Sequence, residues 1–288
     1  MEKEKILVKG IWIVIDMKFH LLASGSKGNC FVLQEGNRTI VIDCGSTKKH
    51  LVSSFHDVNI NIDDVDLVLL THNHTDHIKQ LKLFENSLIY SPVFLEERKD
   101  ARILRPRSYF TIDQTIKVTS IPLSHDADVT LGFIIENKKE KLVYITDTGY
   151  IKDEYTELLY GADYIIIESN HDVGMLMKCN RPYYIKSRIQ GEYGHLNNED
   201  CANTLEKIVS SNTKEIVLAH ISQDANTYEK ALEVSVNHLL KYKKDELNND
   251  LRIVAAKQFE TVSGGIDYEK VNDIDSLPIT CMEWVYDI

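Results

Sequence analysis

The sequence predicts an α/β fold in a single domain. Short runs rich in β-branched and aromatic residues alternate along the chain with segments of helical periodicity. Two of these runs, 163–167 and 215–219, are largely apolar and have the length of a strand that is buried on both faces. The 288 residues contain no internal repeat and no linker rich in proline, glycine or serine. One large domain therefore accounts for the length better than two small ones.

Strands are predicted where apolar and β-branched runs end at polar or turn-forming positions. In chain order they are 18–23, 30–34, 39–42, 66–70, 116–121, 131–136, 141–145, 163–167 and 215–219. Helices are predicted at 92–102, 152–160, 198–210 and 227–243. Asn197 can cap the third helix, and Glu199 and Asp200 in its first turn complement the helix dipole. We expect an N-terminal extension at 1–16, a folded domain at 17–264 and a C-terminal extension at 265–288.

The composition indicates a cytoplasmic protein. Five cysteines are scattered without a CxxC pair, which suits a reducing compartment and argues against a disulfide framework or a cysteine zinc site. No apolar run approaches the roughly 18 residues that span a membrane. The apolar stretch 6–15 is short, is interrupted by Lys9 and has no signal-peptide cleavage site after it. We therefore expect no contact with a membrane.

The most informative segment is 71–77, which reads Thr-His-Asn-His-Thr-Asp-His and follows the mostly apolar run 65–70. Imidazole and carboxylate groups are the usual protein ligands of zinc, manganese and iron. An extended chain points alternate residues the same way, so His72 and His74 can reach one ion. Asp76 and His77 follow at the turn into a helix and can reach a second ion. The alternative is a surface loop that is rich in histidine by chance.

Further candidate ligands stand just beyond predicted strands. They are Asp43, His125, Asp147 and His220. Functional groups in α/β sheets collect at strand ends, where loops leave a packed scaffold. One such residue alone is more often a cap or a core-edge group than a ligand. Together with the 71–77 motif, they predict a single site assembled from distant parts of the chain.

These motifs occur in the order found in the metallo-β-lactamase superfamily, which the sequence resembles from about residue 17 to 260. The matching segments are VIDCG around Asp43, THNHTDH at 71–77, PLSHD around His125, ITDTG around Asp147 and LAHIS around His220. The resemblance implies a four-layer αββα sandwich with two metal ions in a cleft between the sheets. The domain at 17–264 would then be a metal-dependent hydrolase. Gln80 departs from the glycine that often follows the motif.

The resemblance also implies a role for each matching residue. His72, His74 and His125 would hold one divalent ion, and Asp76, His77 and His220 the other. Asp147 would bridge both ions, and Asp43 would orient a ligand without binding metal itself. Zinc or manganese would suit these ligands, and iron would also be accepted.

Three further segments resemble the WalJ/YycJ group of this superfamily, whose members are proposed to be nucleic-acid exonucleases. The first is Ser-Gly-Ser-Lys-Gly-Asn at 24–29. Ser24, Ser26 and Asn29 either contact a substrate phosphate or form a tight turn. The other two segments contain Glu168 and His195, which also resemble the Glu/His pair of the tRNA 3′-processing endonucleases. That likeness implies that His195 serves the leaving oxygen and Glu168 orients it; a structural hydrogen bond is the alternative.

The net charge of −11 opposes a nucleic-acid substrate, because phosphate backbones attract basic surfaces. Divalent ions would offset that charge where the phosphate must bind. Substrate could be gripped by the basic cluster at 98–107 and by Lys178, Arg181, Lys186 and Arg188, with Tyr183 and Tyr184 stacked on a base. The alternatives are a solvated helix face for the basic residues and plain packing for the tyrosines.

We therefore expect a dinuclear-metal phosphodiester hydrolase in which Asp76, His195 and Glu168 are catalytic. The expected activity is that of a 5′-to-3′ exonuclease on double-stranded DNA, with DNA favoured over RNA as the partner. One alternative is a phosphodiesterase for a small cyclic nucleotide or dinucleotide, which the acidic charge favours. An RNA-processing nuclease is another. A non-catalytic binding module is disfavoured by the complete ligand set.

Overall fold

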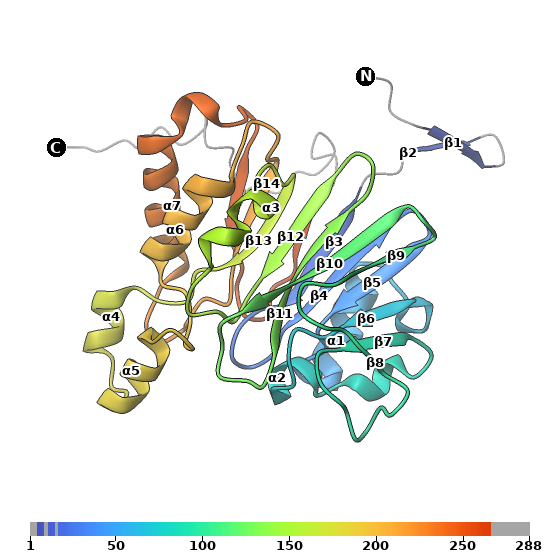
Figure 1. Ribbon diagram of the computed structural model, residues 1–288, viewed down its shortest axis with the longest axis horizontal. Helices are drawn as coiled ribbons and strands as arrows, with labels where there is room; N and C mark the ends of the chain where they lie inside the picture. The colour runs from blue at the N-terminus through green and yellow to red at the C-terminus, as the bar shows by residue number, and fades with distance from the viewer. Residues whose placement is uncertain (1–4, 9–10, 15–16, 266–288) are drawn as a thin grey trace.

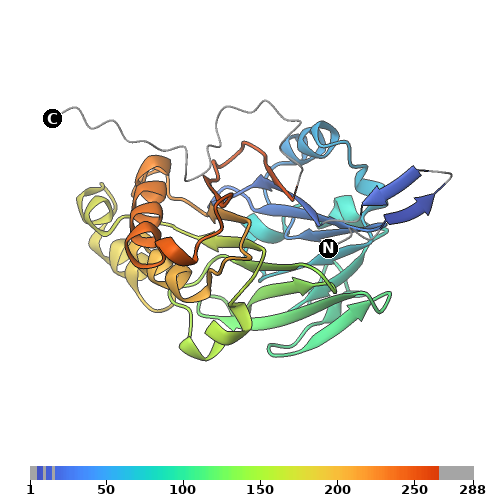
Figure 2. The ribbon, with the colours of Figure 1, turned by 90° about the horizontal axis from the view of Figure 1, so that it is seen from above.

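The computed structural model describes residues 5–8, 11–14 and 17–265. Two seven-stranded sheets pack face to face, and helices cover both outer faces (Figure 1). Figure 2 shows the sheets from above, with the first sheet mostly in blue to teal and the second in green to orange. The αββα sandwich that the sequence resemblance implies is therefore confirmed.

The first sheet has the order β16-β3-β4-β5-β6-β7-β8. Its strands are β3 (Lys18–Ala23), β4 (Cys30–Glu35), β5 (Arg38–Ile42), β6 (Leu67–Leu69), β7 (Leu88–Ser91), β8 (Arg102–Ile103) and β16 (Val262–Gly264). Strands β16 to β5 pair antiparallel, and β5 to β8 pair parallel. Helix α1 (Lys48–Asp57), the short α2 (Thr75–Ile78) and 3₁₀ turns at Ile62–Asp64 and Leu81–Phe84 accompany this sheet.

The second sheet has the order β15-β14-β13-β12-β11-β10-β9. Its strands are β9 (Tyr109–Ile112), β10 (Ile116–Leu123), β11 (Thr130–Glu136), β12 (Lys141–Ile145), β13 (Tyr164–Glu168), β14 (Glu215–Ala219) and β15 (Arg252–Ala255). Strands β9 to β12 pair antiparallel, and β12 to β15 pair parallel.

Helices α3 (Thr156–Leu159), α6 (Asn198–Ile208) and α7 (Tyr228–Tyr242) cover the outer face of the second sheet. The 3₁₀ turns Asp153–Tyr155 and Lys244–Glu246 adjoin α3 and α7. Helices α4 (Val173–Lys178) and α5 (Tyr183–Gln190) project at the lower left of Figure 1.

The central strands are apolar throughout because both of their faces are buried. In β13, Ile166 packs in the core between the sheets, whereas Ile165 and Ile167 pack under the helices. Phe31 of β4 and Tyr144 of β12 meet across the sandwich with ring centroids 5.2 Å apart. Alternate side chains of a strand point to opposite faces, so a strand between two cores needs an uninterrupted apolar run.

The predicted strands are confirmed, with ends that shift by two residues at most. The helices predicted at 198–210 and 227–243 form as α6 and α7, and Asn197 caps α6 by accepting from the N–H of Asp200. The segment 152–160 forms a 3₁₀ turn followed by α3. Elements that the sequence did not predict are mostly short or lie at sheet edges: α1, α4, α5, β7, β8, β9, β15 and β16.

The helix predicted at 92–102 is wrong. The segment forms turns that lead into β8. The guanidinium of Arg98 explains the difference, because it donates to the carbonyl oxygens of Phe84 and Ser87 and pairs with Asp100. Arg98, for which a solvated helix face was the alternative, therefore ties its own loop to the turn that precedes β7.

Residues 5–14 lie in the predicted N-terminal extension, where β1 (Lys5–Val8) and β2 (Ile11–Val14) pair as a separate two-stranded sheet. All but the first residue of the predicted C-terminal extension lies outside the described residues, and the limits at 17 and 264 stay a prediction. No helix in the described ranges is both long and apolar enough to cross a membrane.

Candidate metal centre

The predicted ligands meet at one end of the sandwich, at the bottom of Figure 1, where parallel strands of both sheets end. Strands β5 and β6 lead into Asp43 and the 71–77 segment. Strands β12 and β14 lead into Asp147 and His220, and β13 ends on Glu168. His125 follows β10, and His195 lies in the loop before α6. Parallel strands bring their carboxyl ends to the same edge, so residues far apart in sequence share one site.

Potential ligand atoms form four overlapping groups, each with its atoms within 4.8 Å of one another. The groups are His72–His74–His125, His72–His77–Asp147, Asp76–His77–His220 and Asp147–Glu168–His195–His220. The first and third match the two ligand sets that the sequence resemblance implies. Asp147 lies between them, with Oδ1 3.9 Å from Nε2 of His125 in the first set and 3.3 Å from Nε2 of His220 in the second.

The buried polar atoms of this cluster fit metal ions. Nε2 of His72, Nε2 of His220 and Oδ2 of Asp147 are buried and make no hydrogen bond within the described structure. A buried polar atom without a partner is costly, and most such atoms in folded proteins are paired. Imidazole nitrogens and carboxylate oxygens are suitable ligands for zinc, manganese or iron. The cluster therefore has the composition expected of a dinuclear metal site.

Hydrogen bonds at Nδ1 orient the imidazoles of His72 and His77 in this cluster. Nδ1 of His77 lies 2.8 Å from Oδ2 of Asp43, which fixes the proton on Nδ1 and leaves Nε2 with a lone pair. The hydroxyl of Thr71 donates to the same carboxylate oxygen at 2.8 Å and lies 2.9 Å from Nδ1 of His72. Asp43 thus orients two imidazoles, one directly and one through Thr71. The sequence predicted the role of Asp43 but not that of Thr71.

The imidazoles from the second sheet are held in the same way. Nδ1 of His125 lies 3.1 Å from the carbonyl oxygen of Gly194. Oε1 of Glu168 lies 2.9 Å from Nδ1 of His220 and 2.7 Å from Nδ1 of His195. The sequence paired Glu168 with His195 alone. The structure shows that one carboxylate oxygen accepts from both imidazoles, so Glu168 links the predicted leaving-group residue to a predicted ligand.

Two carboxylates of the centre, Glu168 and Asp147, stay ionised despite their burial. Burial alone would raise the pKa of Glu168, but His195 and His220 lower it to about 2. Burial likewise opposes the charge on Asp147, but the surrounding imidazoles, His220 first, hold its pKa well below the usual range. The centre therefore carries fixed negative charge at neutral pH, which suits cations.

The imidazoles fall into two classes. Burial would lower the pKa of His77 and of His220, but neighbouring carboxylates, Asp43 for the first and Asp147 for the second, raise each to about 9. Burial lowers the pKa of His72 and of His125 in spite of the nearby charge of Asp147. His72 and His125 are thus neutral over the physiological range. A metal ligand must be deprotonated, so an ion bound by His77 and His220 would displace their extra proton.

The backbone turns sharply at the strand ends that carry the site. Asp43, Asp147 and His220 all adopt left-handed conformations, with φ of 59°, 58° and 53°. Such conformations are uncommon outside glycine and cluster at functional sites, where surrounding structure over-determines them. Gly45 is required for a different reason, because a Cβ there would collide with the carbonyl oxygen of Asp76. The VIDCG motif therefore packs directly under a predicted catalytic residue.

The predicted substrate contacts have different surroundings. Ser24 is buried, and its hydroxyl accepts from the N–H of His220 at 2.7 Å. Asn29 is also buried; its Oδ1 accepts from Gly25 N–H, and its Nδ2 lies 2.9 Å from Nε2 of His77. Ser26 is exposed at the tip of the same loop. Ser24 and Asn29 thus support the site from within, and contact with substrate stays a prediction for all three.

Arg188 reaches the edge of the centre through an ion pair with Asp126. Oδ1 of Asp126 lies 3.1 Å from Nε2 of His125, so this pair borders one of the predicted ligands. The sequence analysis did not predict a role for Asp126, although its position directly after His125 indicated that it would lie near the site. The basic residues at 98–107 do not form a single patch. Arg107, for example, pairs with Glu154.

His171 was not predicted as a ligand, and it belongs to none of the ligand groups. Its ring is buried, and within the described structure neither nitrogen has a hydrogen-bond partner. Burial lowers its pKa to about 4. His171 therefore stays neutral beside the centre.

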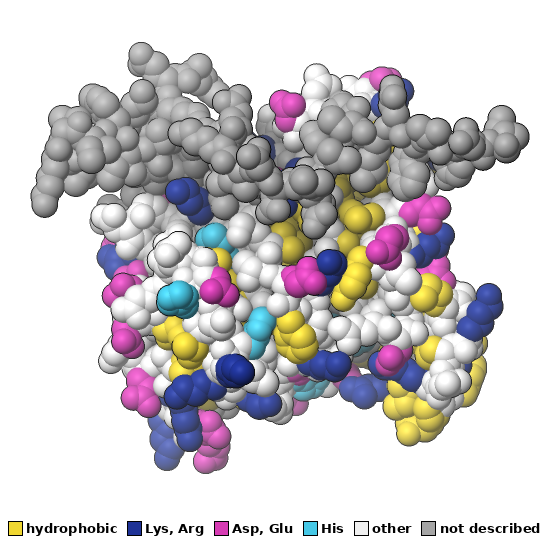
Figure 3. Space-filling view, turned by 180° about the vertical axis from the view of Figure 1, so that it is seen from behind, with side chains coloured by type: hydrophobic (Ala, Val, Ile, Leu, Met, Phe, Trp, Pro, Cys, Tyr) yellow, Lys and Arg dark blue, Asp and Glu magenta, His cyan; other side chains and the backbone are white. Residues whose placement is uncertain are grey.

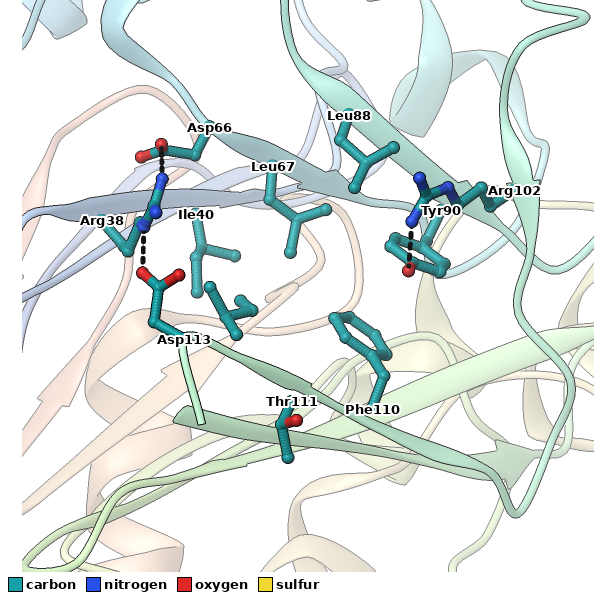
Figure 4. A pocket seen from close by; sticks show the side chains of 11 residues that line it. Arg38, Ile40, Asp66, Leu67, Leu88, Tyr90, Arg102, Phe110, Thr111 and Asp113 are labelled. Atoms are coloured by element: carbon teal, nitrogen blue, oxygen red, sulfur yellow. Dashed lines mark hydrogen bonds and ion pairs between the residues drawn. The ribbon is translucent and has the colours of Figure 1, made fainter. Parts of the chain in front are cut away.

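Two of the cavities in the described part of the chain lie at different places on the sandwich. One of about 360 Å³ adjoins the metal centre and is lined by His125 together with Ser124, Tyr150, Lys152 and Tyr193. The other, of about 320 Å³, opens between β9 and the edge of the first sheet (Figure 4). None of its lining residues belongs to the metal centre, and Arg38 in its wall pairs with Asp66 and Asp113.

Comparisons with known proteins agree with this geometry. A family model described as the beta-lactamase superfamily domain matches residues 38–221. Exodeoxyribonuclease YycJ of Bacillus anthracis is 35% identical over 240 residues, which are 79% of this chain and 90% of that protein. Exodeoxyribonuclease WalJ of Streptococcus pneumoniae (strain D39) is 31% identical over 243 residues, 78% of this chain and 89% of that protein.

Among solved structures, the metallo-β-lactamase fold protein YhfI of Bacillus subtilis superimposes with a TM-score of 0.65. It covers 87% of this chain and 100% of its own, and its 15% identity makes the likeness one of fold. The family match, the curated relatives and the buried His/Asp cluster lead to one assignment. The chain belongs to the metallo-β-lactamase superfamily and is a metal-dependent hydrolase of that superfamily.

Proposed function

We propose that the protein hydrolyses phosphodiester bonds of DNA with two divalent ions, as a 5′-to-3′ exonuclease on double-stranded substrates. The observation that carries this proposal is the Glu168–His195 pair beside the candidate metal centre. Nδ1 of His195 lies 2.7 Å from Glu168 and 3.7 Å from Oδ1 of Asp147, and the His195 side chain is 21% exposed. A partly exposed, oriented imidazole next to the metal ligands is well placed to act on a leaving oxygen.

In this proposal, His72, His74 and His125 hold one ion, Asp76, His77 and His220 hold the other, and Asp147 contacts both. Bound metal ions would neutralise phosphate oxygens and lower the pKa of a water molecule to near neutrality. Zinc or manganese suits these ligands, and iron would also be accepted.

The protein's own residues would then move the protons. Asp76, whose side chain is 29% exposed, would orient the attacking water or accept its proton. His195 would donate a proton from Nε2 to the departing sugar oxygen, because Glu168 holds its Nδ1–H. Proton transfer to or from a positioned side chain contributes about 10²- to 10⁴-fold to the rate of a reaction.

Substrate contacts are proposed on the surface around the centre. Tyr183 and Tyr184 on α5 are 73% and 71% exposed, which leaves their rings free to stack on bases. Arg188 extends from the same helix, and Ser26 lies in the exposed tip of the 24–29 loop. Figure 3 shows Lys and Arg side chains gathered along the lower edge of one face, although acidic residues lie among them. This local basic edge offsets the net charge of −11.

The relatives named exodeoxyribonucleases support DNA over RNA. We propose that residues 17–264 contain the whole hydrolase domain. The cysteines of the described ranges are free, which supports a reducing, cytoplasmic location.

The second candidate is a phosphodiesterase for a small cyclic nucleotide or dinucleotide. Two observations favour it: the acidic net charge and the small cavity beside the centre. A small ester needs no extended basic groove.

The proposal is tested by metal-dependent digestion of end-labelled single- and double-stranded DNA and RNA. Asp76→Asn, purified with its metal content measured, serves as the blank. A 5′-to-3′ exonuclease releases a 5′ label as a mononucleotide at once, whereas a 3′ label stays on a shortening strand. Activity on RNA alone would indicate an RNA-processing nuclease. Hydrolysis of a cyclic dinucleotide with intact polymers would favour the second candidate.

A further inference from the structure

We propose that the cavity beside the metal centre binds the terminal nucleoside of the strand that is cut, with its base against Tyr150 and Tyr193. The proposal rests on the proposed function and deepens it, because it names the part of the substrate that the site recognises. It predicts that the enzyme acts on an unpaired end nucleotide.

Three of the segments that line the cavity also carry a proposed ligand or the proposed acid. Ser124 precedes His125, which itself lines the cavity. Tyr150 follows Asp147 in the loop after β12, and Tyr193 precedes His195 in the loop before α6. The ring of His125 also lies 5.0 Å from that of His195, centroid to centroid. A nucleoside in the cavity would therefore have its own phosphate close to the proposed ligands and to the proposed acid.

The three loops that form the cavity are hydrogen-bonded to one another. The N–H of Gly149 donates to the carbonyl oxygen of Ser124 at 2.8 Å, and the N–H of Ser124 donates to the Thr148 hydroxyl at 3.2 Å. Nδ1 of His125 bonds the carbonyl oxygen of Gly194, next to Tyr193. A cavity built on such contacts is largely formed before substrate arrives, which is usual for small-ligand sites.

The lining suits a flat, apolar group that is attached to an anion. Tyr150 and Tyr193 are 39% and 63% exposed, so each has ring surface available to a ligand. Leu123 and Val129 add apolar wall, Lys152 adds a cation, and the exposed Asp128 adds a carboxylate at the rim. Within the described ranges the Lys152 ammonium makes no ion pair or hydrogen bond. Aromatic rings stack on any base, and a free ammonium pairs with a phosphate.

The size of the cavity favours one nucleoside. Its volume of about 360 Å³ lies near the lower end of the range for small-molecule sites, roughly 300–1,000 Å³. A base that enters it must leave its partner strand, as in enzymes that extrude a base to act on it. Unpairing costs least at a duplex end, which is where an exonuclease works.

The first test compares cleavage of two duplexes that differ only at the terminal nucleotide, ordinary in one and a stable abasic analogue in the other. Base stacking on an aromatic side chain predicts that wild type prefers the ordinary end by about 5- to 150-fold in kcat/KM. The double variant Tyr150→Ala/Tyr193→Ala should lose this preference. Tyr109→Ala, which removes a 69% exposed tyrosine on β9 outside the cavity, should retain it.

The second test measures binding without turnover, so that it stands even if DNA is not cleaved. Deoxyadenosine 5′-monophosphate should bind metal-loaded wild type more tightly than deoxyribose 5-phosphate by a similar factor, and the double variant should abolish the difference. Lys152→Gln should weaken both probes alike, because they share the phosphate.

The two tests separate the possible failures. Equal cleavage of both duplexes by wild type, or a preference that survives in the double variant, would overturn the cavity assignment and leave the nuclease proposal standing. No cleavage of either duplex, with a base-dependent binding difference, would overturn the nuclease proposal and retain a nucleotide site. Equal binding of both probes would overturn the cavity assignment directly.

Discussion

Replacing Glu168 with glutamine changes one atom of the carboxylate and should disturb both a metal ligand and the proposed acid. Oε1 accepts from Nδ1 of His195 and Nδ1 of His220, while Oε2 accepts from the N–H groups of Thr148 and Leu196 at 2.8 and 3.3 Å. Glutamine has a single acceptor oxygen and an NH₂ group that can only donate. The NH₂ group of glutamine must therefore face either the two imidazole donors or the two backbone N–H donors.

Both orientations of the new amide are costly. If NH₂ faces the imidazoles, His220 must accept at Nδ1, so its proton moves to Nε2 and removes the lone pair that a metal needs. If NH₂ faces the backbone instead, two buried N–H groups lose their acceptor, at about 1–3 kcal/mol each. The first orientation should weaken metal binding by about 10- to 100-fold, the usual effect of losing a partner behind a ligand.

Equilibrium dialysis followed by metal analysis measures the first effect, and denaturant unfolding measures the second. Glu168→Gln should show weaker binding of one ion, lower unfolding free energy, or both, together with slow turnover at saturating metal. His195→Ala is the matched control, because it removes the acid and leaves the Glu168–His220 contact in place. If Glu168→Gln bound both ions with wild-type affinity and unfolded like wild type, the shared hydrogen bond would have no energetic role.

Further predictions concern the acid, the metals, a buried histidine and a close backbone approach. His195→Ala should slow turnover by about 10²-fold or more with two ions still bound, measured by kinetics and metal analysis; loss of an ion would make His195 a ligand instead. Chelation should lower the melting temperature, because ions bound only to the folded state stabilise it; an unchanged melting curve would contradict a metal centre. Burial, then Lys18, lowers the pKa of His20 to about 4, so the unfolded chain takes up a proton below about pH 6.5 and stability falls as pH falls toward 4. Denaturant unfolding should give a free energy of unfolding about 2 kcal/mol lower at pH 5 than at pH 7 from this residue, and His20→Gln should remove that difference. Gly45→Ala should reduce both stability and metal content, because the new methyl collides with the Asp76 carbonyl; a normal melting temperature and full metal content would show that the loop moves aside.

The residues that meet in the candidate metal centre could be predicted from the sequence because each follows a strand that is easy to recognise. His72, His74 and Asp76 lie in one short motif, and Asp147 ends a run of buried apolar residues. Buried strands of a sandwich are apolar on both faces, so the break where a polar ligand appears is sharp. The same reasoning placed nine of the fourteen strands of the two sheets to within two residues.

The contacts that orient those ligands could not be predicted in this way. Gly194 reaches His125 through a backbone carbonyl, which carries no sequence signal. Glu168 contacts His220 because β13 and β14 are neighbours in the sheet, a relation that only the assembled topology reveals. Arg98 similarly looked like an exposed helix residue, whereas it caps carbonyl oxygens of a loop. In each case the deciding partner is distant in sequence.

The most direct test titrates Mn²⁺ or Zn²⁺ into metal-free protein and follows the release of label from 5′-labelled duplex DNA against the number of ions bound. We predict that mononucleotide release rises as the second ion binds each chain and stays absent in Asp76→Asn at the same occupancy. Full activity with one ion bound, or intact DNA with two, would contradict a two-metal exonuclease.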